Sequence, residues 1–239
     1  MKLSVGVLPW LSMVRFQDIG KSFFCLLLFL SLFLGSLGFV LGGTLVHGWF
    51  FVSFIFLGLV FYLFIGRSEW ERIPIFFLIL FIWGSLALIF MEDGKIGSAF
   101  FSQFLNEWMS SLLMGSALFS MILGHWYLIR PRLSFHYLIR ACLIFLTLTI
   151  FRMMEVVGML FLRKTGSWMD LLNGAGDIFF LTRFLWGGVL PIFFLVFAYR
   201  CSKIHSNRST TGILYFTTAS IFMGELMAGY LSEVSGLLF

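Results

Sequence analysis

Long apolar runs separated by short polar segments make up most of this chain. A helix needs about 20 predominantly apolar residues to cross a membrane. By that measure the sequence predicts seven spans, at residues 22–43, 49–66, 73–91, 105–129, 135–162, 178–199 and 210–231. The runs are continuous rather than alternating, which favours helices over barrel strands. We therefore expect an all-α fold, a polytopic membrane helix bundle.

The segments outside these runs are short. Residues 1–21 form an N-terminal cytoplasmic or interfacial segment, which Trp10 and Phe16 could anchor. The apolar run after Lys21 is too long for the h-region of a cleavable signal peptide, so we interpret it as a retained first span. Residues 22–239 then form a single transmembrane helical domain, because no polar stretch reaches the size of a soluble domain.

Composition agrees with this pattern. Of the 239 residues, 60% are hydrophobic and 11% are charged, with a mean hydropathy of +1.02. Soluble domains carry about 25% charged residues. We expect an integral membrane protein of the bacterial cytoplasmic (inner) membrane.

Lysine and arginine are unevenly divided between alternate loops. With the N-terminus inside, ten fall on the inner side and three, Lys95, Arg163 and Lys164, on the outer side. Cytoplasmic loops carry the excess of basic residues, so we expect a cytoplasmic N-terminus and an outside C-terminus. The same rule explains the net charge of +5. The lipid bilayer is therefore a sufficient partner for the basic inner surface, and nothing calls for nucleic acid.

Several kinds of chemistry lack a motif here. Cys25, Cys142 and Cys201 occur singly, so no CxxC supports covalent haem, thiolate-bound zinc or iron–sulfur ligation. The chain also has no Walker A, HExxH or GxSxG pattern, which removes motif support for ATP-driven transport, zinc proteolysis and hydrolase chemistry.

Two acids and two bases from the last three spans are predicted to reach a similar depth in the outer half of the membrane. Counting 1.5 Å per helical residue places Arg152 about two-thirds of the way out, with Glu155 on the same helix face. Arg183 lies roughly one turn below the outer surface, and Glu225 lies in the outer half of its span. A charge at membrane depth costs roughly 3 kcal/mol or more, so such residues mark candidate functional sites. Polar residues predicted to form a rim above them are Gln103, Asn106, Glu107 and Asp177.

Two interpretations of this set stay open. In one, Arg152–Glu155 and Arg183–Glu225 are structural ion pairs that fix the register of the helices. In the other, the four side chains form a site for a polar head group or a proton path. Arg183 is also close enough to the surface to snorkel.

His125 and His136 flank the turn Arg130–Pro131–Arg132 at similar depth near the predicted cytoplasmic face. Two histidines on facing helices can ligate a b-type haem. Adjacent helices lie only about 8–10 Å apart, however, which leaves little room for haem between them. We favour interfacial histidines that bond to carbonyls or lipid phosphates, and no metal.

The sixth span contains the sequence Trp186-Gly-Gly-Val-Leu-Pro191. Proline has no N–H and clashes with the carbonyl four residues back, at Gly187. With two glycines beside it, this is where we expect a kinked or broken helix, either as a packing feature or lining a site.

The C-terminal third, from Phe184 to Pro191 and through Thr210–Tyr215 to Gly224–Tyr230, resembles the last helices of membrane anchors of the polysulfide/dimethyl sulfoxide reductase type. The resemblance implies a helical subunit without catalytic metal that exchanges electrons between quinone and an iron–sulfur partner, with its quinone site towards the outer face.

We therefore predict an anchor subunit of a multi-subunit redox complex, with iron–sulfur or cytochrome partner subunits. Arg152 and Arg183 would bind the quinone oxygens, and Glu155 and Glu225 would transfer protons. If the chain takes part in catalysis, it does so as a subunit of a quinone oxidoreductase. The alternatives are a secondary transporter or channel-like protein that uses the same charges, and a structural or assembly subunit without a site.

Overall fold

The computed structural model describes residues 98–130, 133–162 and 181–235, together with short stretches between residues 6 and 33. The chain divides into two compact units, Met1–Phe119 and Ser120–Phe239, with the boundary inside one helix. The spans predicted at 49–66 and 73–91 lie outside the described residues, and the span at 22–43 is described only in part.

All regular elements of the described residues are helices. They are α2 (Phe16–Ile19), α6 (Ser98–Ile129), α7 (His136–Leu162), the π-helical η1 (Leu185–Val189), α10 (Leu190–Lys203) and α11 (Asn207–Ser235). This confirms the all-helical prediction for the part of the chain that the structure describes.

Three stretches are long and apolar enough to cross a membrane: Leu105–Ile129, His136–Gly158 and Leu181–Lys203. They coincide with predicted spans 105–129, 135–162 and 178–199 to within a few residues. The predicted span 210–231 forms a helix, α11, but this helix is not one of the three. Its face toward the core is rich in buried hydroxyl residues: Thr210, Thr211, Thr217, Thr218 and Ser220. The length and composition of these three helices support a membrane protein, while the number of seven spans and the orientation remain predictions.

In the first unit, the N-terminal part of α6 lies close to residue 6. An ideal Cβ on Gly115 would come within 1.9 Å of the carbonyl carbon of Gly6, so only a glycine fits there. The rings of Phe23 and Phe119 meet edge to face at 6.1 Å between centroids. Small residues and aromatic contacts therefore bring the two segments together.

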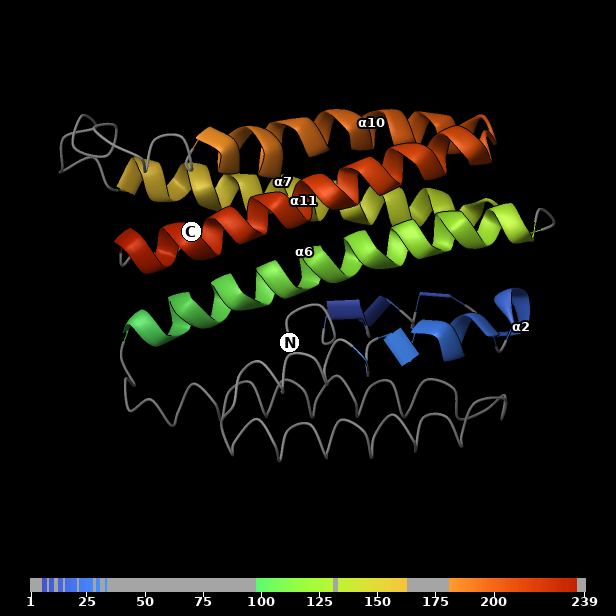
Figure 1. Cartoon of the computed structure of the whole chain (residues 1–239), viewed down its shortest axis with the longest axis horizontal. Coiled ribbons are helices and arrows are strands. Elements are labelled where there is room, and N and C mark those ends of the chain that lie inside the picture. The colour runs from blue at the N-terminus through green and yellow to red at the C-terminus, as the bar shows by residue number, and fades with distance from the viewer. Residues whose placement is uncertain are drawn as a thin grey trace. The chain divides into compact units, whose positions relative to one another are not determined.

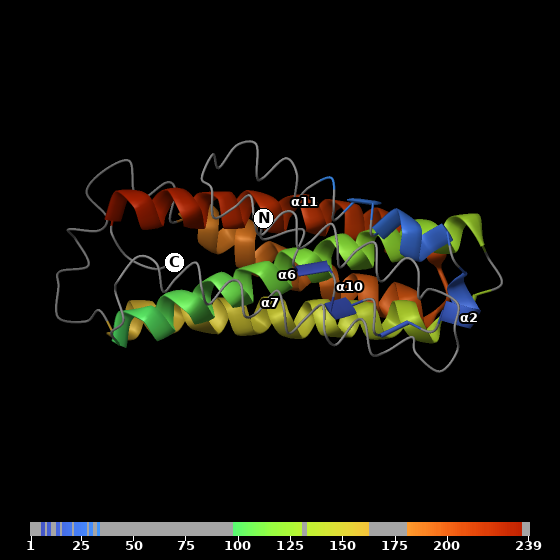
Figure 2. The same cartoon turned by 90° about the horizontal axis from the view of Figure 1, so that it is seen from below.

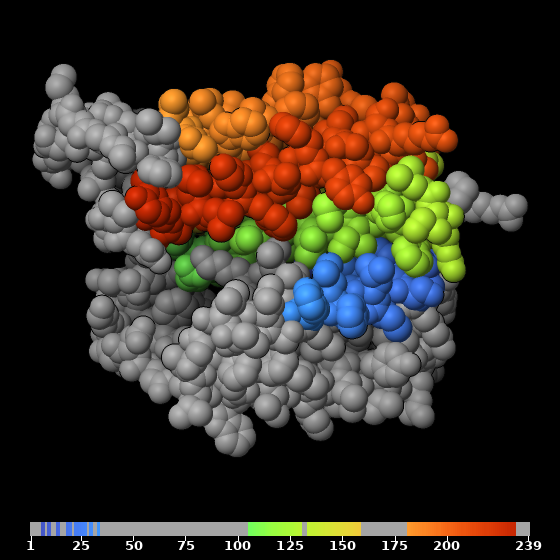
Figure 3. All heavy atoms as spheres, viewed as in Figure 1, coloured from blue at the N-terminus to red at the C-terminus, as the bar shows by residue number. Residues whose placement is uncertain are grey.

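The second unit contains the C-terminal end of α6, then α7, η1 with α10, and α11. Figures 1 and 2 show α7, η1–α10 and α11 running side by side, each antiparallel to the one before it in the chain. The surfaces of α10 and α11 meet along their length (Figure 3). Phe145, Leu195, Leu214 and Ile221 are fully buried between these helices.

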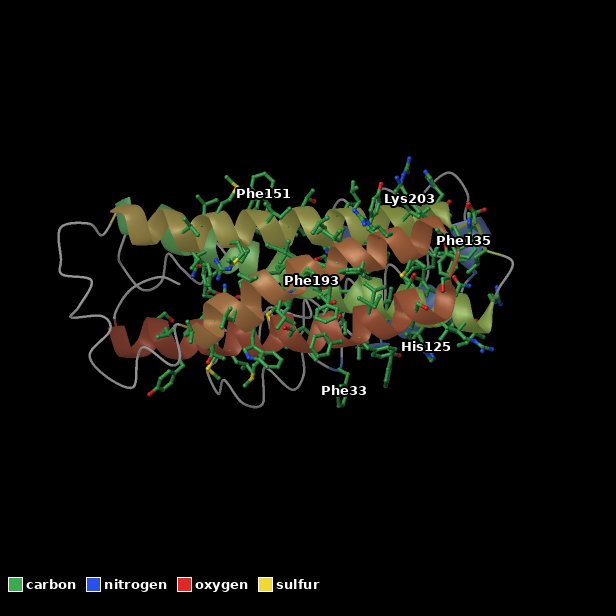
Figure 4. All side chains as sticks on the ribbon, turned by 90° about the horizontal axis from the view of Figure 1, so that it is seen from above. Phe33, His125, Phe135, Phe151, Phe193 and Lys203 are labelled. Carbon is green, nitrogen blue, oxygen red and sulfur yellow. The ribbon has the colours of Figure 1, made fainter. Side chains whose placement is uncertain are left out.

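Large apolar side chains also cover the outside of this unit. Phe151 on α7 is 59% exposed and Phe193 on α10 is 58% exposed, and Figure 4 shows Phe151 pointing away from the other helices.

At the end of the unit where α6, α7, α10 and α11 turn, basic groups lie over aromatic rings. The Arg130 guanidinium is 5.7 Å from the Trp126 ring and the Lys203 ammonium is 4.8 Å from the Tyr199 ring. An apolar belt that ends in paired basic and aromatic residues is typical of a helix bundle in a bilayer.

Candidate functional site: a buried arginine–glutamate cluster

The four charged residues predicted from the sequence meet inside the second unit. Arg152 and Glu155 come from α7, Arg183 from the turn of helix that precedes η1, and Glu225 from α11. Three of these side chains are almost completely buried, at 3% exposed for Arg152, 2% for Arg183 and 4% for Glu225, whereas that of Glu155 is 38% exposed. Glu155 is thus the member of the cluster that reaches the surface.

Arg152 holds both carboxylates. Its Nε donates to Glu225 Oε1 at 3.1 Å, and its Nη2 donates to Glu225 Oε2 at 3.3 Å. Its Nη1 donates to Glu155 Oε2 at 2.9 Å. The first pair of bonds is bidentate, a geometry that fixes both side chains as well as attracting them.

Arg183 shares Glu225 with Arg152. Its Nη2 lies 2.8 Å from Glu225 Oε1, a contact that forms an ion pair but lies off the hydrogen-bond direction. The predicted pairs Arg152–Glu155 and Arg183–Glu225 are therefore both present. The contact between Arg152 and Glu225 joins them into one network.

The guanidinium of Arg183 has more donors than acceptors around it. Its Nε and Nη1 find no hydrogen-bond acceptor among the residues that the structure describes, although the side chain is 2% exposed. An arginine is always charged in proteins and carries five N–H donors. A buried donor without an acceptor costs about 1–3 kcal/mol, and more on a charged group. Arg183 therefore has the binding capacity for an additional oxygen acceptor.

Two glycines let Arg183 lie in this position. A Cβ on Gly187 would come within 2.8 Å of both Arg183 Nη1 and the Gly224 α-carbon. A Cβ on Gly224 would come within 3.1 Å of the same nitrogen. Helix α11 and η1 thus pack backbone against backbone at these two glycines, and the Arg183 guanidinium lies against this crossing.

The predicted break in this helix takes the form of a π-helical turn. The Leu190 N–H bonds to the Leu185 carbonyl, five residues back. In that register the Trp186 carbonyl would accept from residue 191, which is a proline and has no N–H. Ser220 of α11 donates to this carbonyl instead, with its Oγ 2.5 Å away. The π turn thus leaves the Trp186 carbonyl without a donor at residue 191, and α11 supplies one through Ser220.

The two histidines lie at the other end of the unit and have their own neighbours. His125 Nδ1 is 3.2 Å from the Tyr215 hydroxyl, and the His136 ring meets the Tyr137 ring at 5.7 Å between centroids. Both are exposed. These contacts belong to an aromatic and polar boundary, which is where the sequence placed them. The interpretation of this pair as interfacial histidines, favoured over haem ligands, stays a prediction.

Three of the predicted rim residues, Gln103, Asn106 and Glu107, lie on the part of α6 that belongs to the first unit. The fourth, Asp177, lies outside the described residues. Ser220 lies near the cluster, and so does the close contact between Gly187 and Gly224. The sequence alone did not connect these residues to the cluster. A usable signal was present, since Ser220 and Gly224 lie one helical turn apart and so share one face of α11.

Comparisons of this chain with protein-family models, curated proteins and solved structures give no match.

Proposed function

We propose that this protein is an integral membrane anchor subunit of a multi-subunit redox complex, and that it binds a membrane quinone at the cluster of Arg152, Arg183, Glu155 and Glu225. The observation that carries the proposal is the buried Arg183 guanidinium, whose Nε and Nη1 have no acceptor among the described residues. The resemblance of the C-terminal helices to quinone-linked anchors supports it.

A quinone fits these donors for a chemical reason. Its carbonyl oxygens accept hydrogen bonds, while its ring and tail are apolar and reach the site through the hydrocarbon of the bilayer. A buried, fixed cation is also suited to the reaction, because negative charge develops on the quinone oxygens when they receive electrons. Electrons would come from iron–sulfur or cytochrome subunits of the complex.

Reduction of a quinone to a quinol takes up protons as well as electrons, and the carboxylates supply a route for them. Glu155 is the better placed of the two for exchange with the outside, since its side chain is 38% exposed and contacts only one guanidinium in the cluster. Glu225 touches both guanidiniums and lies next to the open donors of Arg183. In the proposal, Glu155 exchanges protons with the surroundings and Glu225 hands them to the bound ligand.

The competing interpretation is a structural network, favoured by the observation that Glu225 contacts two arginines at once. A structural network needs the charges in place but requires no proton transfer. The two interpretations therefore differ in what happens when a carboxylate is replaced by an amide of the same shape.

The test measures the melting temperature and the quinol-linked turnover of Glu155→Gln and of Glu225→Gln, each in the intact complex. Glu155→Gln keeps the volume and one acceptor oxygen, so we expect its melting temperature to stay near that of the unchanged protein. Quinol-linked turnover should fall by about 100-fold or more, because an amide carries no proton. Full turnover in a stable Glu155→Gln protein would contradict the proposal and leave the structural interpretation.

Ser232→Ala provides a matched control on the same helix as Glu225. Ser232 lies two turns beyond Glu225 on α11 and donates only to the carbonyl of Gly229 in its own helix. It should change neither melting temperature nor turnover. A loss of turnover in this control would show that the assay reports general damage to α11.

A further inference from the structure

The charge around Arg183 points to the kind of oxygen that the site binds best. Glu225 is the acid that contacts Arg183, and this carboxylate is shared with Arg152 through both of its oxygens. The remaining acid, Glu155, contacts Arg152 and reaches the surface. Arg183 therefore shares its contacting carboxylate with Arg152, and its Nε and Nη1 have no acceptor among the described residues.

A hydrogen bond from a guanidinium to an anionic oxygen is about twice as strong as one between neutral partners. The difference is largest where water is excluded, because opposite charges attract more strongly in a medium of low dielectric constant. Arg183 is 2% exposed, so both conditions are met. A neutral carbonyl would satisfy one open donor but would form the weaker hydrogen bond of the two.

We propose that the cluster prefers an anionic oxygen to a neutral one, and that among quinones it selects those with an ionised ring hydroxyl next to a carbonyl. Such a hydroxyl is a vinylogous carboxylic acid, which loses its proton at neutral pH and spreads the charge over two oxygens. This inference rests on the proposed function, because it specifies the ligand of the same site.

The open donors of Arg183 are Nε and Nη1, which lie on different edges of the planar group, so a ligand oxygen can bind at either edge. Nη1 lies against the crossing of Gly187 and Gly224. An oxygen bound at Nη1 meets no Cβ from either glycine.

The experiment compares two ligands that differ by one methyl group. A hydroxynaphthoquinone is titrated into the purified full-length protein at neutral pH, and its methoxy ether, which cannot ionise, is titrated in parallel. We expect the ionised ligand to bind at least about tenfold more tightly, as one charge-assisted hydrogen bond implies. Equal affinities, or tighter binding of the ether, would overturn the preference for an anion while leaving quinone binding intact.

If neither ligand binds, the proposed function and this inference are both overturned. This outcome differs from equal binding of the two ligands, which overturns the inference alone. In Arg183→Gln the preference should disappear and both ligands should bind equally. In Arg183→Lys the charge remains with fewer donors, so both ligands should bind more weakly while the ionised one stays preferred. Gly229→Ala, at a position with open space around it, is the matched control and should keep the full preference.

Discussion

A Cβ placed on Gly224 would lie 2.2 Å from the α-carbon of Gly187, closer than any real pair of such atoms. The crossing of η1 and α11 therefore requires glycine at this position. We predict that Gly224→Ala lowers the free energy of unfolding by about 1–3 kcal/mol, because backbone would have to move. The effect is measured as the melting temperature of the protein in detergent.

Gly229→Ala is the control for that change. Gly229 lies on the same helix, five residues further on, with no atom within 4 Å of its ideal Cβ. Alanine is the better helix former by about 0.5–1 kcal/mol, so this variant should be as stable as the unchanged protein or more so. If both variants melt alike, the close crossing does not exist in the folded protein.

A second prediction concerns the charge network. Glu225→Leu leaves two buried guanidiniums without their shared acid, and we expect a loss of about 3–5 kcal/mol in the free energy of unfolding. The double change Arg183→Leu with Glu225→Leu should recover most of this loss, since Arg152 keeps Glu155 as a partner. Chemical unfolding of the three proteins gives the comparison. A double variant no more stable than Glu225→Leu would show that the two residues do not interact.

Ser220 should stabilise the π turn through its bond to the Trp186 carbonyl. We predict a loss of about 1 kcal/mol for Ser220→Ala, the contribution of one buried hydrogen bond. The loss should be smaller when Pro191 is also changed to alanine, because residue 191 then has an N–H of its own to donate. A double-mutant cycle measures this coupling, and equal losses in both backgrounds would argue against it.

The orientation of the chain is a separate prediction from the distribution of basic residues. A reporter that is active only outside the cytoplasm, fused after Phe239, should be active. Activity of a cytoplasm-only reporter at the same point would reverse the orientation and place the cluster in the inner half of the membrane.

The sequence was sufficient to predict the spans that the structure describes best. Hydropathy alone predicts 105–129, and the structure has an apolar span at Leu105–Ile129. Helical rise also predicted that Arg152, Arg183 and Glu225 reach a similar depth, because depth depends only on residue number along each helix. The weaker apolar character of α11 follows from hydroxyl residues that are buried on its inner face.

The contact between Arg152 and Glu225, which links the two ion pairs into one network, could not be predicted from helical rise. Whether Arg152 reaches Glu225 depends on the rotation of α7 and α11 about their axes, and a single sequence leaves that rotation undetermined. The same holds for Ser220, whose partner became available only because η1 adopts a five-residue register. The close contact of Gly224 with Gly187 likewise depends on the relative position of the two helices.

The most direct test of the central claim is equilibrium binding of a quinone to the purified protein and to the double variant Arg183→Gln with Glu225→Gln. The double variant removes one charge of each sign and keeps side-chain amides in their place, so it should fold and melt close to the unchanged protein. We predict that quinone affinity falls by at least about tenfold in this variant, through the loss of the Arg183 donors. Unchanged affinity in a folded double variant would contradict the assignment of the cluster as the quinone site.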